Sequence, residues 1–331
     1  MTAAVAKCEV TDGLLAVNKE AGWTSHDVVA KVRGLFCGTK VGHAGTLDPA
    51  ATGLLPLLIG KATRIAEYLV EWDKEYRAHL RLGQTTDTLD ATGAILERKP
   101  TDELTSDMIR KAVDRFRGEI QQVPPMYSAV KIKGVPLYRS ARAGKTITRN
   151  ARTVVIHGLE VLDIAGPDVT LRVVCSKGTY IRTLCADIGN VLGVGGHLRA
   201  LERTRVGPLT LNRALTVDEI IDRHTIGSLS GYVWSLDEVL QALPGLVVDG
   251  RAAERVCHGA PVAWANVVTM VDGPGQPQAG PVRIHDGAGR LLAVGRLSDP
   301  PFESIAIEKV FVAESVSQTE KKEGENSSWP C

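Results

Sequence analysis

Two stretches with strict alternation of apolar and polar residues constrain the fold most. Within residues 74–82 the side chains of Tyr76, Ala78, Leu80 and Leu82 alternate with those of Arg77, His79 and Arg81; residues 169–175 repeat the pattern of alternation. A period of two predicts strands with one buried face. Amphipathic segments that begin at Thr24, Thr105 and Tyr180 predict helices between these strands. The chain is therefore expected to fold as an α+β protein.

Length and composition divide the chain further. The 331 residues suggest about two domains. A break at Leu243-Pro244-Gly245 separates a first domain, residues 13–243, from residues 244–312, where short apolar runs alternate with glycine-rich turns and predict a small all-β domain. Residues 1–12 form an N-terminal extension, and residues 313–331 are too polar to bury a core, which predicts a disordered tail.

Composition also excludes several classes of protein. The six cysteines form no C-x-x-C pair, which indicates a reducing compartment, and no paired histidine or cysteine spacing indicates a zinc site. No apolar run approaches the roughly 20 residues of a membrane span. We therefore expect a cytoplasmic protein with no metal. The P-loop and G-x-S-x-G motifs are absent from the sequence as well.

One segment carries strong positive charge although the whole chain has a formal charge of only +1. No acidic residue lies between Lys131 and Val155, whereas seven basic residues do: Lys131, Lys133, Arg139, Arg142, Lys145, Arg149 and Arg152. Such a segment can neutralise several phosphates of a nucleic acid. A solvated surface is the alternative. A second basic cluster comprises Arg199, Arg203 and Arg205, and Tyr138 could stack on an exposed base.

A glycine-rich stretch after residue 41 holds one carboxylate, Asp48, between Gly45 and Gly53, beside Pro49 and near His43. Asp-Pro is a common start of a turn, so these residues alone favour a structural loop. An exposed carboxylate on such a loop could equally act as a nucleophile or as a general base.

The order of several motifs decides between these alternatives. Residues 42–56, GHAGTLDPAATGLLP, resemble the signature loop of the TruB family of tRNA pseudouridine synthases. Further blocks follow the order of that family at residues 18–25, 73–76, 81–88, 125–129 and 176–182, so the resemblance spans about residues 13–207. One departure is Glu20, which stands where the family usually has proline.

The resemblance implies a mixed, largely antiparallel sheet with flanking helices and a small C-terminal all-β domain similar to PUA domains. It gives Asp48 the place of the catalytic aspartate, Tyr76 that of the tyrosine that stacks on the base, and Arg182 that of the arginine paired with the aspartate. A neighbouring arginine should lower the pKa of Asp48. Further residues expected at the RNA are His43, Tyr180, Leu201, Lys19, Lys131, Lys133, Arg142, Arg149 and Arg152.

The implied activity is isomerisation of uridine to pseudouridine at position 55 in the T loop of tRNA, after the base has flipped out of its stack. The basic insertion, about residues 125–152, would grip the T arm, and the family needs neither a cofactor nor a guide RNA. A monomer and an accessory role in tRNA folding are further expectations. The sequence leaves open whether Asp48 attacks the base, attacks the ribose or supports an elimination.

Two other functions fit parts of the sequence. A non-catalytic RNA-binding or folding factor would keep the basic segment and make no pseudouridine. A guide-RNA-dependent synthase shares the aspartate loop but would be inactive on free tRNA. The all-basic insertion favours direct binding of tRNA.

Overall fold

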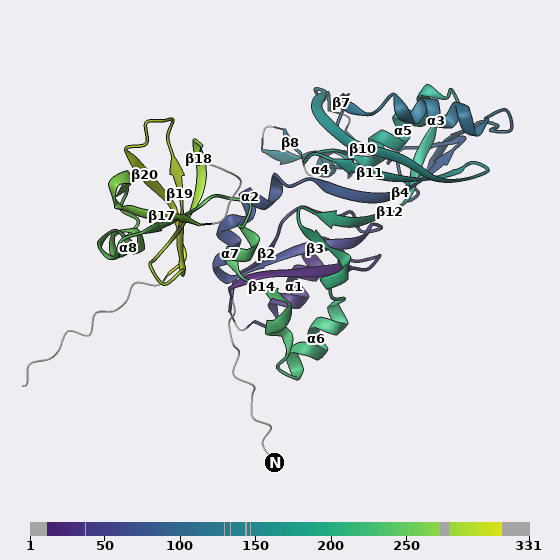
Figure 1. Ribbon diagram of the computed structural model, residues 1–331. Helices are drawn as coiled ribbons and strands as arrows, with labels where there is room; N and C mark the ends of the chain where they lie inside the picture. Colours follow the sequence, from purple (N-terminus) through teal and green to yellow (C-terminus); the bar gives the residue numbers. More distant parts are fainter. Residues whose placement is uncertain are drawn as a thin grey trace, which may run out of the picture. The chain divides into compact units, whose positions relative to one another are not determined.

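The computed structural model describes residues 12–36, 38–128, 130–132, 134–142, 144–145, 147–271 and 278–312 (Figure 1). The chain divides into two compact units, the first ending at Ser235 and the second starting at Leu236. This division lies eight residues before the predicted boundary at 243/244, because residues 236–243 belong with the second unit. In the described residues no helix has the length and apolar character needed to cross a membrane.

The first unit is built on one large, mostly antiparallel sheet. Its strand order is β14-β1-β3-β12-β4-β11-β10-β7, with β13 beside β12 and β2 beside β3. Among the strand pairs that the described residues form in this sheet, β3 with β12 is parallel and the others are antiparallel. The strands are β1 (Gly13–Lys19), β2 (Val41–His43), β3 (Thr52–Ile59), β4 (Lys74–Leu82), β7 (Gly118–Gln122), β10 (Arg152–Ala165), β11 (Asp168–Cys175), β12 (Gly196–Val206), β13 (Leu209–Thr210) and β14 (Val233–Trp234). The predicted α+β class with a mixed, largely antiparallel sheet is confirmed.

The two alternating sequences form β4 and β11, which lie side by side in the sheet. They pair antiparallel, with Leu80 opposite Val169 and Ala78 opposite Leu171, and all four side chains are buried. Helices α3 (Ser106–Asp114) and α5 (Ile181–Val191) add their apolar faces to the same core. The period-two pattern therefore reports the side of each strand that the helices cover.

A second core lies under β1 and β3. It includes residues of α1 (Ser25–Arg33) and α6 (Val217–Thr225), and each helix starts with a complete capping box, formed by Thr24 with Asp27 and by Thr216 with Glu219. These reciprocal bonds satisfy main-chain N–H groups that a helix start leaves without partners. Short helices η1 (Gly60–Ile65), α2 (Ala66–Val70), η2 (Leu211–Arg213) and η3 (Leu229–Tyr232) complete this region.

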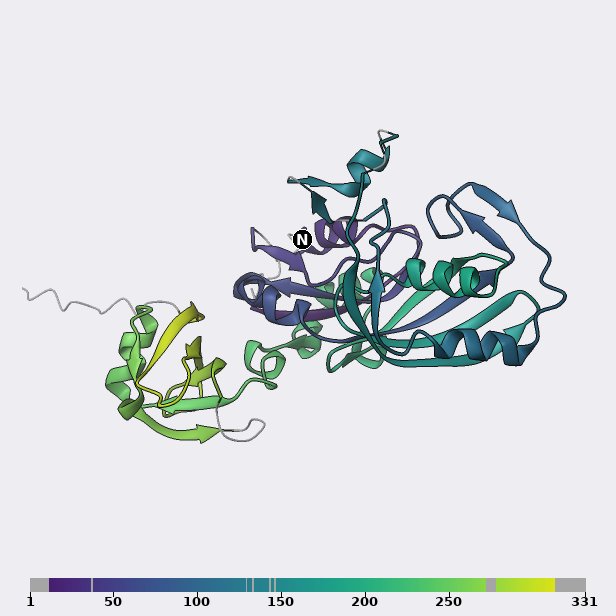
Figure 2. The same cartoon turned by 90° about the horizontal axis from the view of Figure 1, so that it is seen from above.

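Two small hairpins extend from the large sheet. One pairs β5 (Gln84–Thr86) with β6 (Ile95–Arg98); the other pairs β8 (Lys131–Ile132) with β9 (Val135–Pro136) and continues into α4 (Leu137–Arg142). The second hairpin belongs to the basic insertion and stands out from the sheet as the teal projection in Figure 2.

The second unit is a six-stranded sheet with the order β16-β20-β19-β18-β15-β17. Its elements are α7 (Leu236–Val239), β15 (Gly245–Val248), α8 (Gly250–Cys257), β16 (Val262–Ala263), η4 (Trp264–Asn266), β17 (Val267–Val271), β18 (Gly280–His285), β19 (Leu291–Leu297) and β20 (Ser304–Val310). The small β domain expected here is present. It also carries α8, which the sequence did not predict and which packs Ala252 and Val256 into the core of the sheet.

Candidate active site

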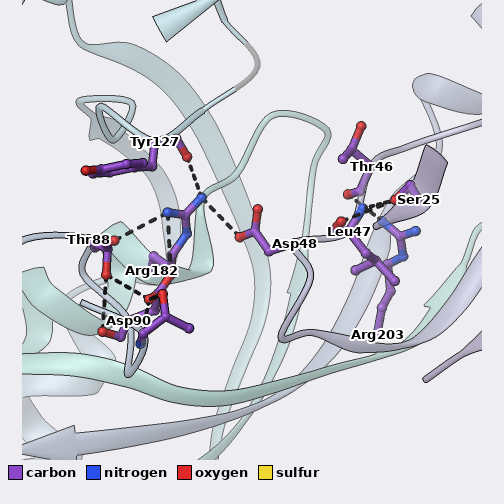
Figure 3. Close-up of polar contacts among 10 residues, drawn as sticks. Ser25, Thr46, Leu47, Asp48, Thr88, Asp90, Tyr127, Arg182 and Arg203 are labelled. Atoms are coloured by element: carbon purple, nitrogen blue, oxygen red, sulfur yellow. Dashed lines mark hydrogen bonds and ion pairs between the residues drawn. The ribbon is translucent and has the colours of Figure 1, made fainter. Parts of the chain in front are cut away.

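The loop that carries Asp48, residues 44–51, connects β2 to β3 and is fixed by its neighbours (Figure 3). The Ser25 hydroxyl accepts a hydrogen bond from Leu47 N–H at 2.9 Å and donates one to Leu47 C=O at 3.2 Å. Gly53, the second residue of β3, has φ +96°, and a Cβ there would lie 2.3 Å from the carbonyl oxygen of Arg203. Only glycine suits both constraints, so the chain holds the loop tightly against β12.

Lys19 is part of this support and was expected instead among the RNA contacts. Its side chain is fully buried, and its ammonium donates to the carbonyls of Glu20 at 2.9 Å, Trp23 at 2.8 Å and Pro49 at 3.2 Å. Burial lowers the pKa of Lys19 to about 8. All three donors of the ammonium are thus engaged with the chain, and the RNA contact of Lys19 stays a prediction. The main-chain carbonyl of Glu20 serves as an acceptor whatever its side chain.

Arg203 holds the loop from the other side. Its side chain is 1% exposed, and it donates to Leu54 C=O at 2.7 Å, Gly45 C=O at 2.9 Å and Thr46 C=O at 3.5 Å. The sequence placed this residue in a basic cluster for RNA. A guanidinium buried among carbonyls instead stabilises the main chain around Asp48, since each of its three nitrogens finds an acceptor there.

Asp48 and Arg182 are in contact, as their pairing predicted. The distance between Asp48 Oδ2 and Arg182 Nη2 is 3.0 Å, and the side chains are 45% and 7% exposed. Arg182 also donates to Tyr127 C=O at 2.7 Å and Thr88 C=O at 3.3 Å, and lies 3.6 Å from Asp90 Oδ2. Figure 3 shows its guanidinium surrounded by these groups on one side and by Asp48 on the other. The arginine is buried and fixed, whereas the aspartate stays accessible.

The pKa of Asp48 moves in the direction opposite to the expected one. Burial raises it above the ordinary value of 3.8, and this effect outweighs the attraction of Arg182, while the negative charge of Asp90 raises it further. The expectation considered Arg182 alone and is wrong, because desolvation and a second carboxylate act on the same group. A carboxylate with a raised pKa is a stronger base once it is ionised.

A cavity of about 270 Å³ opens beside this pair. Its size is close to the lower end of ligand pockets, roughly 300 Å³. Tyr76 lies in its wall, and burial raises the pKa of the hydroxyl, which keeps it protonated. Asp48, Tyr76, Tyr180, Arg182 and Leu201 all line this cavity, so the structure brings together five of the predicted residues, with Ser128, Lys74 and Arg203 beside them.

His43 lies just before the loop, at the end of β2, and is not part of the cavity wall that the described residues form. Its ring meets that of His26 edge to face, with 5.6 Å between the centroids. Burial lowers the pKa of His43, and the positive charge of Arg203 acts in the same direction. The ring is therefore neutral at pH 7, and its expected contact with a flipped nucleotide stays a prediction.

The basic insertion is described only in part. Lys133 and the side chains of Lys131 and Arg142 lie outside the described residues. Arg149 donates to Pro124 C=O at 3.1 Å, which ties the insertion to its own base, and Arg152 is exposed at the start of β10. These five residues remain predicted RNA contacts.

The sequence missed the partners of Arg182 other than Asp48. Thr88 closes the motif block at 81–88 and Asp90 follows that block, and the third partner, Tyr127, acts through its main-chain carbonyl. The position of Asp90, shortly after the block at 81–88, was the available signal. In the described residues no group of three or more His, Cys, Asp or Glu side chains could hold a metal.

A largely antiparallel sheet with an aspartate–arginine pair at a central cavity matches the class of pseudouridine synthases that the motifs indicated. Family models confirm this class: residues 33–181 match the N-terminal domain of the TruB family pseudouridylate synthases, and residues 182–246 match the C-terminal domain of tRNA pseudouridylate synthase B. The chain belongs to the TruB family.

Curated relatives and solved structures agree with this assignment. The chain is 45% identical to tRNA pseudouridine synthase B of Burkholderia mallei (strain NCTC 10247) over 87% of this chain and 94% of that protein. It is 44% identical to the protein of the same name from Thermobifida fusca (strain YX), over 86% and 94%. Among solved structures, a Cbf5-Nop10-Gar1 complex contains a chain with a TM-score of 0.74 and 29% identity, covering 92% of this chain and 86% of that one.

Proposed function

We propose that this chain isomerises uridine to pseudouridine in tRNA, at position 55 of the T loop. The observation that carries the proposal is the accessible carboxylate of Asp48, 3.0 Å from the buried guanidinium of Arg182, at a cavity lined by Tyr76. The names of the relatives, tRNA pseudouridine synthase B, support the same reaction and the same class of RNA.

The proposed reaction uses the side chains of Asp48, Arg182 and Tyr76. The bond from ribose C1′ to N1 breaks, the base turns, and a bond from C1′ to C5 forms; C5 loses a proton and N1 gains one, so the conversion involves no net oxidation. The target base must leave the RNA stack to reach a protein carboxylate, and an aromatic ring such as Tyr76 can replace the lost stacking.

Asp48 is the group that acts on the substrate. In its ionised form it can attack ribose C1′ or the base as a nucleophile, or remove a proton from the ribose on an elimination route. Arg182 occupies Oδ2 and fixes the direction of the carboxylate. Because the same carboxylate serves all three routes, the loss of Asp48 tests the site without choosing between them.

The RNA is held outside the cavity by the basic insertion. The seven basic residues between Lys131 and Val155, with no acidic residue among them, can bind the phosphates of the T arm. The second unit binds another part of the tRNA. Direct gripping supports activity on free tRNA without a guide RNA. A monomeric state, a cytoplasmic location and an accessory role in tRNA folding complete the proposal.

The test is tritium release from C5-labelled uridine in an unmodified tRNA transcript, with no other RNA or protein added. We expect release by the wild type and none above background by Asp48→Asn at equal folded concentration. If both proteins bind the transcript and neither releases tritium, the protein is a binding or folding factor. Release only after a guide RNA is added would assign it to the guide-dependent class.

A further inference from the structure

Gln122, outside the cavity wall formed by the described residues, is closely linked to it. It is the last residue of β7 and is 2% exposed. Its amide pairs with both main-chain groups of Tyr180: Tyr180 N–H donates to Oε1 at 3.0 Å, and Nε2 donates to Tyr180 C=O at 3.3 Å. A buried amide that meets one residue through both its donor and its acceptor fixes the position of that main chain.

The position that it fixes is the start of α5. Tyr180 directly precedes this helix and provides no side-chain cap of its own. The helix begins at Ile181, so Arg182 is its second residue. Because a helix propagates rigidly from its first turn, the place of Tyr180 determines where the Arg182 side chain leaves the main chain.

The segment that follows Gln122 also contacts the side chain of Arg182. Five residues after Gln122, the carbonyl of Tyr127 accepts a hydrogen bond from Arg182 Nη2 at 2.7 Å. This is the nitrogen that contacts Asp48 Oδ2 at 3.0 Å. Residues 122–127 therefore hold Arg182 at both ends, by its main chain through Tyr180 and by its guanidinium through Tyr127.

We propose that Gln122 is a positioning residue for the isomerisation, which sets the start of α5 so that Arg182 meets Asp48. The inference rests on the proposed function and adds a residue that does not touch the substrate. A shift of about 1 Å in such a pair is enough to lower turnover by about 10²-fold.

The chain offers a matched control one residue away. Gln121 has the same side chain on the same strand, is exposed, and donates from Nε2 to the Thr153 hydroxyl at 2.8 Å. Gln121→Met and Gln122→Met each replace an amide by an apolar side chain of similar length. They differ in burial and in the contact that is lost, which is the main chain of Tyr180 for Gln122 and the Thr153 hydroxyl for Gln121.

The experiment measures kcat and KM for tRNA and the pH dependence of kcat. Gln122→Met is expected to lower kcat about 10- to 100-fold at nearly unchanged KM, and Gln121→Met to stay within about twofold of the wild type. If Gln122→Met does not fold, Gln122→Glu takes its place, because it keeps the acceptor for Tyr180 N–H and loses the donor; its kcat should fall less than 100-fold but more than twofold.

The pH profile separates positioning from general support of the fold. When Arg182 moves away, Asp48 loses its nearest positive charge, so its pKa rises and the acid limb of the kcat profile moves to higher pH. The other charged groups that act on Asp48 are Asp90 and Lys19. The inference would be overturned if the acid limb of Gln122→Met did not move, or if Gln121→Met and Gln122→Met lost equal factors in kcat. A wild type without activity would overturn the proposed function itself.

Discussion

The two units each contain an aspartate paired with a buried arginine, and the two pairs behave in opposite ways. Asp48 and Arg182 lie 3.0 Å apart with side chains 45% and 7% exposed; Asp237 and Arg283 lie 2.7 Å apart with side chains 40% and 5% exposed. Despite this likeness, the pKa of Asp48 is raised and the pKa of Asp237 is lowered from the same ordinary value.

The surroundings of each arginine explain the difference. Burial acts to raise the pKa of Asp237, but hydrogen bonds from His285, at 2.9 Å, and from Arg283 overcome it. Both arginines also donate to main-chain carbonyls, Arg182 to Thr88 and Tyr127 and Arg283 to Leu243, but Arg182 stands beside a second carboxylate, Asp90. A carboxylate that accepts hydrogen bonds from several neighbouring donors stabilises the fold. A carboxylate with fewer hydrogen-bond donors around it is available for chemistry.

The largest effect expected from this comparison is on turnover. Asp48→Asn should lower kcat by about 10⁴-fold or more, because the amide is neither a nucleophile nor a base. Asp237→Asn, which changes the matching pair in the other unit, should leave kcat at saturating tRNA within about threefold. Multiple-turnover rates at saturating concentrations of one transcript provide both kcat values, and equal losses would show that the two pairs do not differ in role.

A smaller loss is expected at the arginine of the same pair. Arg182→Met removes the positive charge beside Asp48 and should lower kcat about 10²- to 10³-fold, the range seen when one preorganised donor is lost. The pKa of Asp48 should rise further, so the acid limb of the pH profile should move to higher pH. Arg182→Lys restores a charge but not the planar fork, and should recover only part of kcat. If the acid limb of the pH profile did not move, Arg182 would have no influence on the ionisation of Asp48.

The next expected effect is a loss of stability caused by the change at Asp237 in the second unit. Asp237→Asn removes the carboxylate charge that Arg283 and His285, both nearly buried, contact at 2.7 and 2.9 Å, and should cost about 1–3 kcal/mol at pH 7. The folded-state pKa of Asp237 is lowered, so the stabilisation is complete above the unfolded pKa and is lost as the pH falls through the folded value. Urea unfolding of wild type and variant should therefore differ at pH 7 and converge in acid.

The contrast between the pairs also shows what the sequence can predict. Alternation gave β4 and β11 with their buried faces because period two depends only on neighbouring residues. The motif order gave Asp48 and Arg182 as partners. The direction of the Asp48 pKa could not follow, since it depends on burial and on Asp90, which only the folded chain brings close.

Other features outside the reach of the sequence have similar causes. The sequence records the charge of Lys19 and Arg203 but not the carbonyls that surround them, so their support of the Asp48 loop could not be predicted. Helix α8 buries only Ala252 and Val256, too weak a pattern to separate a helix from the strands around it. Charge type is thus readable from sequence in both units, whereas the role of each charge depends on contacts between distant residues.

The smallest expected effect is on the stability of the Asp48→Asn variant, and its sign is opposite to that of the effect expected for Asp237→Asn. A folded-state pKa that is raised means that ionisation of Asp48 disfavours the folded protein, so its cost is absent in acid and grows as the pH rises through the folded pKa. Asp48→Asn resembles the protonated acid and should be slightly more stable than the wild type at pH 7, with a Tm about 1–3 °C higher. The difference should shrink when the wild type is also protonated at low pH. Thermal unfolding at pH 7 and pH 4 checks both statements. If Asp48→Asn instead lost stability at pH 7, the carboxylate would be a satisfied partner like Asp237, and the distinction between the two pairs would fail.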